Sequence, residues 1–114
     1  MSPITTHVLD TALGRPAEGI AIALFLRDAG GDFHRLGQGT TDADGRIREL
    51  LPAEHALMAG LYRMVFQVAE YHRRRHTPGF YPSVTIDFEI VEPEQHHHIP
   101  LLLSPFGYST YRGS

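Results

Sequence analysis

Histidine and arginine are the side chains with the greatest capacity for chemistry in this chain of 114 residues. The sequence contains eight histidines, and all ten residues that make up its Lys and Arg total are arginines. Cysteine and lysine are both absent, which excludes thiol nucleophiles, thiolate metal sites, Schiff-base catalysis and the phosphate-loop lysine. A reaction run by this chain would therefore rest mainly on imidazole as an acid or base and on guanidinium as a fixed positive charge.

Three consecutive histidines, at positions 96–98, lead into an apolar run that begins at Ile99. On a β-strand, His96 and His98 would point to one face and His97 to the other. We expect His96 and His97 to be exposed near the start of the strand. His98 directly precedes the apolar run, so it should be half-buried. It is a candidate general base, because the ordinary pKa of imidazole lies near neutrality.

Two residues far from this cluster could complete a site. His7 lies within an alternating segment, in step with Thr5 and Leu9, and taken alone it is typical of a structural histidine. Arg46 directly follows an Asp-Gly turn and carries a charge that cannot be titrated away. Such a guanidinium could stabilise an oxyanion or hold a planar imide through its fork of donors. Arg48 falls on the same side of the predicted strand and is a competing candidate for this role.

A metal site is the alternative use of the histidines. A His-x-His pair on a strand with a third histidine is a known zinc arrangement, and His96, His98 and His7 could supply it. A nearby arginine would repel a dication. The turn at 42–45 does not match a calcium loop, because Leu51 would occupy the last ligand position. We therefore predict no metal and no other cofactor.

The apolar pattern predicts a protein built almost entirely of β-strands. Residues 83–90 alternate strictly between polar and apolar types, which predicts a strand near 83–91, and 19–27 and 61–69 alternate in a similar way. Residues 69–76 break this pattern and predict a short helix. Eight short strands without a βαβ rhythm indicate one antiparallel β-sandwich domain over residues 1–114. The weaker patterns predict the remaining strands over 4–10, 33–40, 46–50, 97–103 and 108–112.

Composition also bounds the possible partners. The formal net charge of −3 argues against a nucleic-acid partner, which would call for a basic surface. No apolar run approaches the ~20 residues of a membrane span. The first residues show neither a basic nor an apolar signal region, so we expect a cytoplasmic protein.

Three motifs, in order along the chain, carry a family resemblance. The first is Thr-Thr-His-Val-Leu-Asp at 5–10, followed by Gly-Arg-Pro-Ala at 14–17. The second is Thr-Asp-Ala-Asp-Gly-Arg at 41–46, and the third is the ending Tyr-Arg-Gly-Ser at 111–114. Together they resemble the 5-hydroxyisourate hydrolases, the transthyretin-related enzymes of urate breakdown. The resemblance implies a transthyretin-type sandwich with a short helix after its fifth strand.

This resemblance also implies a function and a set of site residues. The expected reaction is hydrolysis of 5-hydroxyisourate to 2-oxo-4-hydroxy-4-carboxy-5-ureidoimidazoline in urate catabolism, without a cofactor. The motifs point to His7, Arg46 and His98 for catalysis, and to His7, Arg46, Tyr111 and Ser114 for substrate binding. The expected assembly is a homotetramer, a dimer of dimers with sites between its dimers. Which histidine is the base stays open, as does whether Ser114 acts through its hydroxyl or its terminal carboxylate.

A non-catalytic carrier is the second alternative. Transthyretin itself shares the expected fold and carries a hormone, and a fold does not determine a function. Transthyretin lacks the Tyr-Arg-Gly-Ser ending, however. A pure carrier also has no need for the combination of His7, Arg46, His98 and Tyr111, so the hydrolase is favoured.

Overall fold

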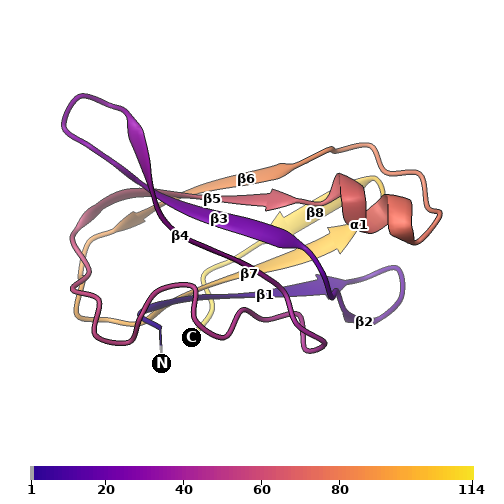
Figure 1. The fold of residues 1–114 in the computed structure, drawn as a ribbon, viewed down its shortest axis with the longest axis horizontal. Helices are drawn as coiled ribbons and strands as arrows, with labels where there is room; N and C mark the ends of the chain where they lie inside the picture. The colour runs from indigo at the N-terminus through magenta and orange to yellow at the C-terminus, as the bar shows by residue number, and fades with distance from the viewer. Residues whose placement is uncertain (1) are drawn as a thin grey trace.

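Two four-stranded β-sheets pack face to face in the computed structural model, which describes residues 2–114 (Figure 1). Met1, the first residue of the predicted domain, lies outside the described residues. One sheet has the strand order β2-β1-β7-β8 and the other has the order β4-β3-β5-β6. The predicted β-sandwich of about eight strands with one short helix is confirmed. The elements are β1 (Ile4–Asp10), β2 (Arg15–Pro16), β3 (Ala21–Arg27), β4 (Phe33–Thr40), β5 (Gly60–Gln67), α1 (Ala69–Arg74), β6 (Val84–Ile90), β7 (His97–Ser104) and β8 (Gly107–Thr110).

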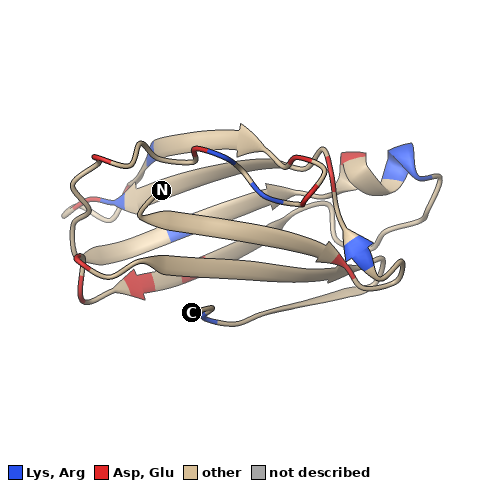
Figure 2. Ribbon diagram, turned by 90° about the horizontal axis from the view of Figure 1, so that it is seen from below, with Lys and Arg blue, Asp and Glu red and all other residues tan. Residues whose placement is uncertain are grey.

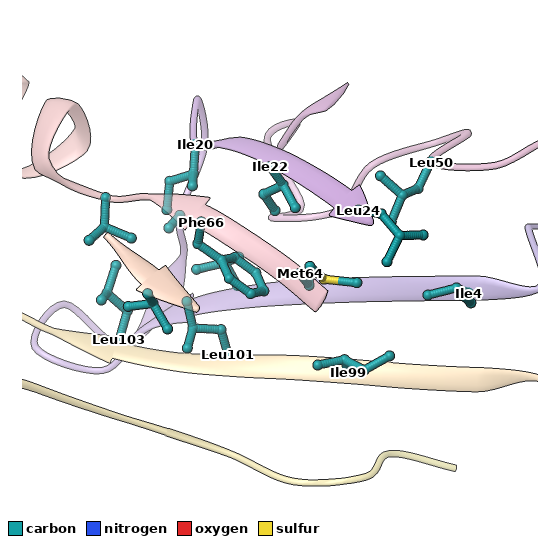
Figure 3. Close-up of a cluster of buried hydrophobic side chains, with 14 of the residues drawn as sticks. Ile4, Ile20, Ile22, Leu24, Leu50, Met64, Phe66, Ile99, Leu101 and Leu103 are labelled. Atoms are coloured by element: carbon teal, nitrogen blue, oxygen red, sulfur yellow. The ribbon is translucent and has the colours of Figure 1, made fainter. Parts of the chain in front are cut away.

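The core lies between the sheets and is filled by the alternating residues of their inner faces (Figure 3). Met64 and Phe66 of β5 meet Leu101 of β7 there, and all three are fully buried. Full burial of an aliphatic or aromatic side chain contributes about 1.5–3 kcal/mol to stability. The strands therefore hold their outward-facing side chains on a rigid support.

The pairing of β1 with β7 corrects the prediction of a purely antiparallel sandwich. These two strands run parallel, with Ile4 opposite His97 and Thr5 opposite His98. The chain enters β7 from β6, which belongs to the other sheet, so no hairpin connects β7 to β1. The parallel register places the first strand directly beside His98.

The segment 46–50 corrects a second prediction, because it is not a strand. Its only ladder contact is a single bridge between Arg46 and His7. Residues 48–50 form a turn and a bend, which carry Leu50 and Leu51 into the core. The segment therefore closes one end of the sandwich with turns. The total of eight strands still holds, because the structure adds the short strand β2, which was not predicted.

The start of β1 and the last residues of the chain lie toward the same end of the sandwich, opposite α1 (Figure 1). Arginines and carboxylates are interspersed along loops, strand ends and α1 (Figure 2). Within residues 2–114, no helix has the length and apolar character needed to cross a bilayer.

Candidate active site

A cavity of about 550 Å³ opens where the first strand, the 42–48 segment, the start of β7 and the last residue of the chain meet. Three of the predicted site residues, Arg46, His98 and Ser114, line it. The full lining consists of Thr5, Thr6, Asp42, Arg46, Ile47, Arg48, His96, His98 and Ser114. Segments from both ends of the sequence therefore build one site.

Arg46 is placed by a tight turn against β1. The Asp42 carboxylate accepts hydrogen bonds from the backbone N–H groups of Asp44 and Arg46, at 2.9 and 3.1 Å. Gly45 adopts a φ of +75°, and a Cβ at this position would lie 2.4 Å from the backbone oxygen of Val8. Only glycine meets both conditions, so the Asp-Gly pair of the motif lets the turn approach β1 and presents Arg46 to the cavity.

His7 lies beside Arg46 through the backbone bridge between the two residues. The structure does not place His7 in the lining of the cavity itself. Burial and the Arg46 guanidinium lower the pKa of His7, against the opposing effect of a hydrogen bond to the Asp44 backbone. His7 is therefore biased toward the neutral form close to the site.

His98 is held by Thr5, its neighbour across the parallel ladder. The Nδ1 atom of His98 lies 2.7 Å from the Thr5 hydroxyl, which leaves the Nε2 atom of the ring as the nitrogen available to the cavity. Burial is the largest cause that lowers the pKa of His98, followed by the positive charge of Arg46. The predicted half-burial is confirmed, and the lowered pKa makes His98 a neutral proton acceptor near pH 7.

The end of the chain crosses over His98. The backbone N–H of Gly113 donates to the carbonyl oxygen of His98 at 2.9 Å. A Cβ on Gly113 would lie 2.5 Å from the Cδ2 atom of the His98 ring. The glycine of the Tyr-Arg-Gly-Ser ending is thus required for this close approach, and the approach brings Ser114 to the cavity.

Tyr111, like His7, is a predicted site residue that does not line this cavity. It is 58% exposed and lines a second cavity of about 300 Å³, beside Phe88 and His97. The expectation that His97 is exposed is wrong, since only 6% of it is accessible. His97 shares the inward face of β7 with Ile99 and Leu101, whereas His98 faces outward.

Thr5 and His96 were not among the predicted site residues. Thr5 contacts His98, and His96 contacts Thr5. Thr5 belongs to the first motif, two residues before His7, and its alternation with His7 already placed both on one face. His96 is exposed, as expected, and its Nε2 atom lies 3.0 Å from the Thr5 hydroxyl. Within residues 2–114, no three His, Cys, Asp or Glu side chains are grouped to hold a metal ion.

Comparison with known proteins identifies the family of this chain. A family model described as the HIUase/Transthyretin family matches residues 4–113. The chain belongs to the HIUase/Transthyretin family. A relative from Mesorhizobium japonicum, named 5-hydroxyisourate hydrolase, is 48% identical over 115 residues, which cover 97% of this chain and 91% of the relative. A relative of the same name from Caulobacter vibrioides is 44% identical over the whole of both chains.

Solved structures with this fold include a 5-hydroxyisourate hydrolase and a transthyretin bound to thyroxine. Klebsiella pneumoniae 5-hydroxyisourate hydrolase superposes with a TM-score of 0.81 at 34% identity, over 97% of this chain and 92% of that one. Sea bream transthyretin, solved in complex with thyroxine, superposes with a TM-score of 0.90 at 32% identity, over 97% and 94%. The backbone alone therefore does not separate the two activities in this family.

Proposed function

We propose that this protein is a 5-hydroxyisourate hydrolase of urate degradation, which adds water to a ring carbonyl of its substrate and opens the ring to 2-oxo-4-hydroxy-4-carboxy-5-ureidoimidazoline. One observation carries the proposal: a neutral-biased imidazole, His98, and a fixed cation, Arg46, line the same cavity. These are the two groups that hydrolysis of a cyclic amide needs. The names of relatives that are 40–48% identical to this chain support the same reaction.

Proton transfer from water is assigned to His98. Its Nδ1 atom is occupied by Thr5, so Nε2 takes the proton of the attacking water while the oxygen bonds to the ring carbonyl carbon. The neighbouring Arg46 keeps the starting imidazole neutral through charge repulsion. The resulting imidazolium can return a proton to the departing ring nitrogen.

Charge stabilisation is assigned to Arg46. Attack by water converts the carbonyl into a tetrahedral centre whose oxygen carries a negative charge, and a guanidinium that stays protonated can meet that charge. His7, adjacent to Arg46, is the second imidazole of the site. Its lowered pKa suits it to orient water or to hydrogen bond the substrate in its neutral form.

Substrate binding and assembly are proposed together. Ser114 reaches the cavity in its own subunit, whereas Tyr111 lies outside it and is 58% exposed. A homotetramer in which subunits meet over the open cavity would enclose a flat polar heterocycle and would bring further side chains, Tyr111 among them, to the substrate. Light scattering at micromolar concentration should give four times the subunit mass of 12.8 kDa, and a monomer would contradict this assembly.

The test of the function is the absorbance decay of freshly generated 5-hydroxyisourate with and without the protein. Added protein should accelerate the decay in proportion to its concentration, both before and after treatment with EDTA. A His98→Asn variant serves as the matched inactive control. Saturable binding of the compound without accelerated decay would instead support the carrier alternative, and loss of activity with EDTA followed by its return with zinc would support a metal site.

A further inference from the structure

Thr5 occupies an unusual position, because one hydroxyl contacts two imidazole rings. The Thr5 Oγ1 atom lies 2.7 Å from Nδ1 of His98 and 3.0 Å from Nε2 of His96. The two rings are stacked, with centroids 6.5 Å apart and planes 16° from parallel. All three side chains line the cavity of the proposed active site.

The proton count of this contact restricts the rings. A hydroxyl donates one hydrogen bond, so it can donate to only one of the two nitrogens. For both contacts to be hydrogen bonds, at least one of the two nitrogens, His98 Nδ1 or His96 Nε2, must carry a proton and donate to the hydroxyl oxygen. When the hydroxyl donates to one ring, that nitrogen is unprotonated and the nitrogen of the other ring is protonated.

The proposed role of His98 decides between the two rings. Nε2 can take a proton from water only while it carries a lone pair, and a neutral imidazole then carries its one proton on Nδ1. The chain of bonds runs from His98 Nδ1–H to the Thr5 oxygen, and from the Thr5 hydroxyl to His96 Nε2. Neutral His98 keeps its lone pair on Nε2, toward the cavity.

We propose that Thr5 is a positioning residue that fixes the tautomer of His98 and connects His98 to His96, which accepts the proton that His98 passes on. The inference rests on the proposed hydrolase function. When His98 Nε2 takes a proton from water, the Nδ1 proton moves to Thr5 Oγ1 and the hydroxyl proton of Thr5 moves to His96 Nε2. The positive charge passes to His96, and His98 is left neutral with a proton on Nε2.

The surroundings favour placing the positive charge on His96, at the outer end of this series of hydrogen bonds. Arg46 and Arg48 line the cavity, His7 adds to the repulsion at His98, and Asp42 is the one Asp or Glu among the described residues that line it. His96 is exposed, so water can solvate its charge. The neutral His98 that results carries an Nε2–H that can protonate the departing nitrogen, and the charge on His96 then passes back along the same path.

The experiment compares Thr5→Val with Thr5→Ser, since valine keeps the shape and removes the hydroxyl. Thr5→Val should lower kcat by roughly tenfold, the scale of one hydrogen bond, and should shift the acid limb of the pH–rate profile, whereas Thr5→Ser should restore both. Thr11→Val is the matched control, because the Thr11 hydroxyl bonds the Leu103 carbonyl at 3.1 Å at the far end of β1. His96→Gln should slow the reaction, and its effect should not multiply with that of Thr5→Val.

A second readout does not depend on turnover. Nitrogen-15 NMR of the histidine rings should show His98 protonated on Nδ1 and unprotonated on Nε2 in the neutral protein, and should show this preference lost in Thr5→Val. An active wild-type enzyme whose Thr5→Val variant keeps the wild-type kcat, pH profile and His98 tautomer would overturn the inference alone. Equal defects in Thr5→Val and Thr5→Ser would also overturn it. A wild-type protein without hydrolase activity would instead overturn the proposed function, while the NMR result would still report on the tautomer.

Discussion

Replacing Arg46 should separate its two proposed effects, which are stabilisation of the oxyanion and lowering of the pKa of His98 and His7. Arg46→Gln removes the fixed cation from the cavity that it shares with His98. Loss of one such oxyanion partner typically lowers kcat by about 10²–10³-fold, or ~2.7–4 kcal/mol. The variant should also titrate differently, because Arg46 is the second-largest cause of the lowered pKa of both His98 and His7, after burial.

The sign of the pH effect follows from these causes. Without Arg46, the pKa of His98 rises, although burial still holds part of the depression in place. Because the base works only when it is neutral, the acid limb of kcat/KM should move to higher pH. Arg46→Lys keeps the charge but loses the planar fork, so its rate should fall while its acid limb stays near that of the wild type.

The assay is the decay of freshly generated 5-hydroxyisourate followed from pH 5 to pH 8, with folding checked by circular dichroism. Arg48→Gln is the matched variant, since Arg48 lines the same cavity and is the competing candidate. The reasoning fails if Arg46→Gln keeps the wild-type kcat/KM, or if its acid limb moves to lower pH. A larger loss in Arg48→Gln than in Arg46→Gln would transfer the role to Arg48.

Three further predictions concern the histidines, the end of the chain and the core. His98→Asn and His7→Asn should each lose ~10²–10⁴-fold in kcat/KM, with losses that do not multiply in the double variant; a fully active His98→Asn protein would refute the assignment of the base. Removal of residues 111–114, which follow the last residue of β8, should abolish activity and leave a cooperative thermal transition; an unfolded or fully active product would contradict this. Leu101→Ala, at a fully buried position, should lower the free energy of unfolding in urea by ~2–5 kcal/mol, and an unchanged midpoint would show that the site is not core.

The sequence was sufficient to predict the faces of the strands, because alternation records which side of a strand is buried. β6 shows this directly, with Val84 and Ile90 buried and the polar residues between them exposed. Alternation does not record which strands are neighbours, so the parallel pairing of β1 with β7 could not be derived from it. Residues 46–50 mixed charged and apolar types closely enough to suggest a strand, but only Arg46 makes a bridge and the backbone turns at 48–50.

The site was predictable where a motif fixes a local shape and unpredictable where it depends on distant contacts. The Asp-Gly turn before Arg46 could be read from sequence, since few other residues adopt that backbone conformation. The burial of His97 could not be predicted from sequence. The run from Leu101 to Leu103 is apolar on both faces of the strand, so it does not indicate which face turns inward. The link from Thr5 to two histidines depends on the β1–β7 register, which only the fold supplies.

The parallel contact between β1 and β7 has a consequence for how the protein is made. Thr5 meets its two histidine partners across 91 and 93 positions of sequence. On a ribosome, the edge of the first strand that faces β7 stays unpaired until β7 has been synthesised. The cavity is completed later still, when Ser114 follows. A nascent chain that stops before Ser114 would therefore lack turnover. Contacts of such high sequence separation also favour slow folding, which would lengthen the interval in which that edge depends on chaperones for protection.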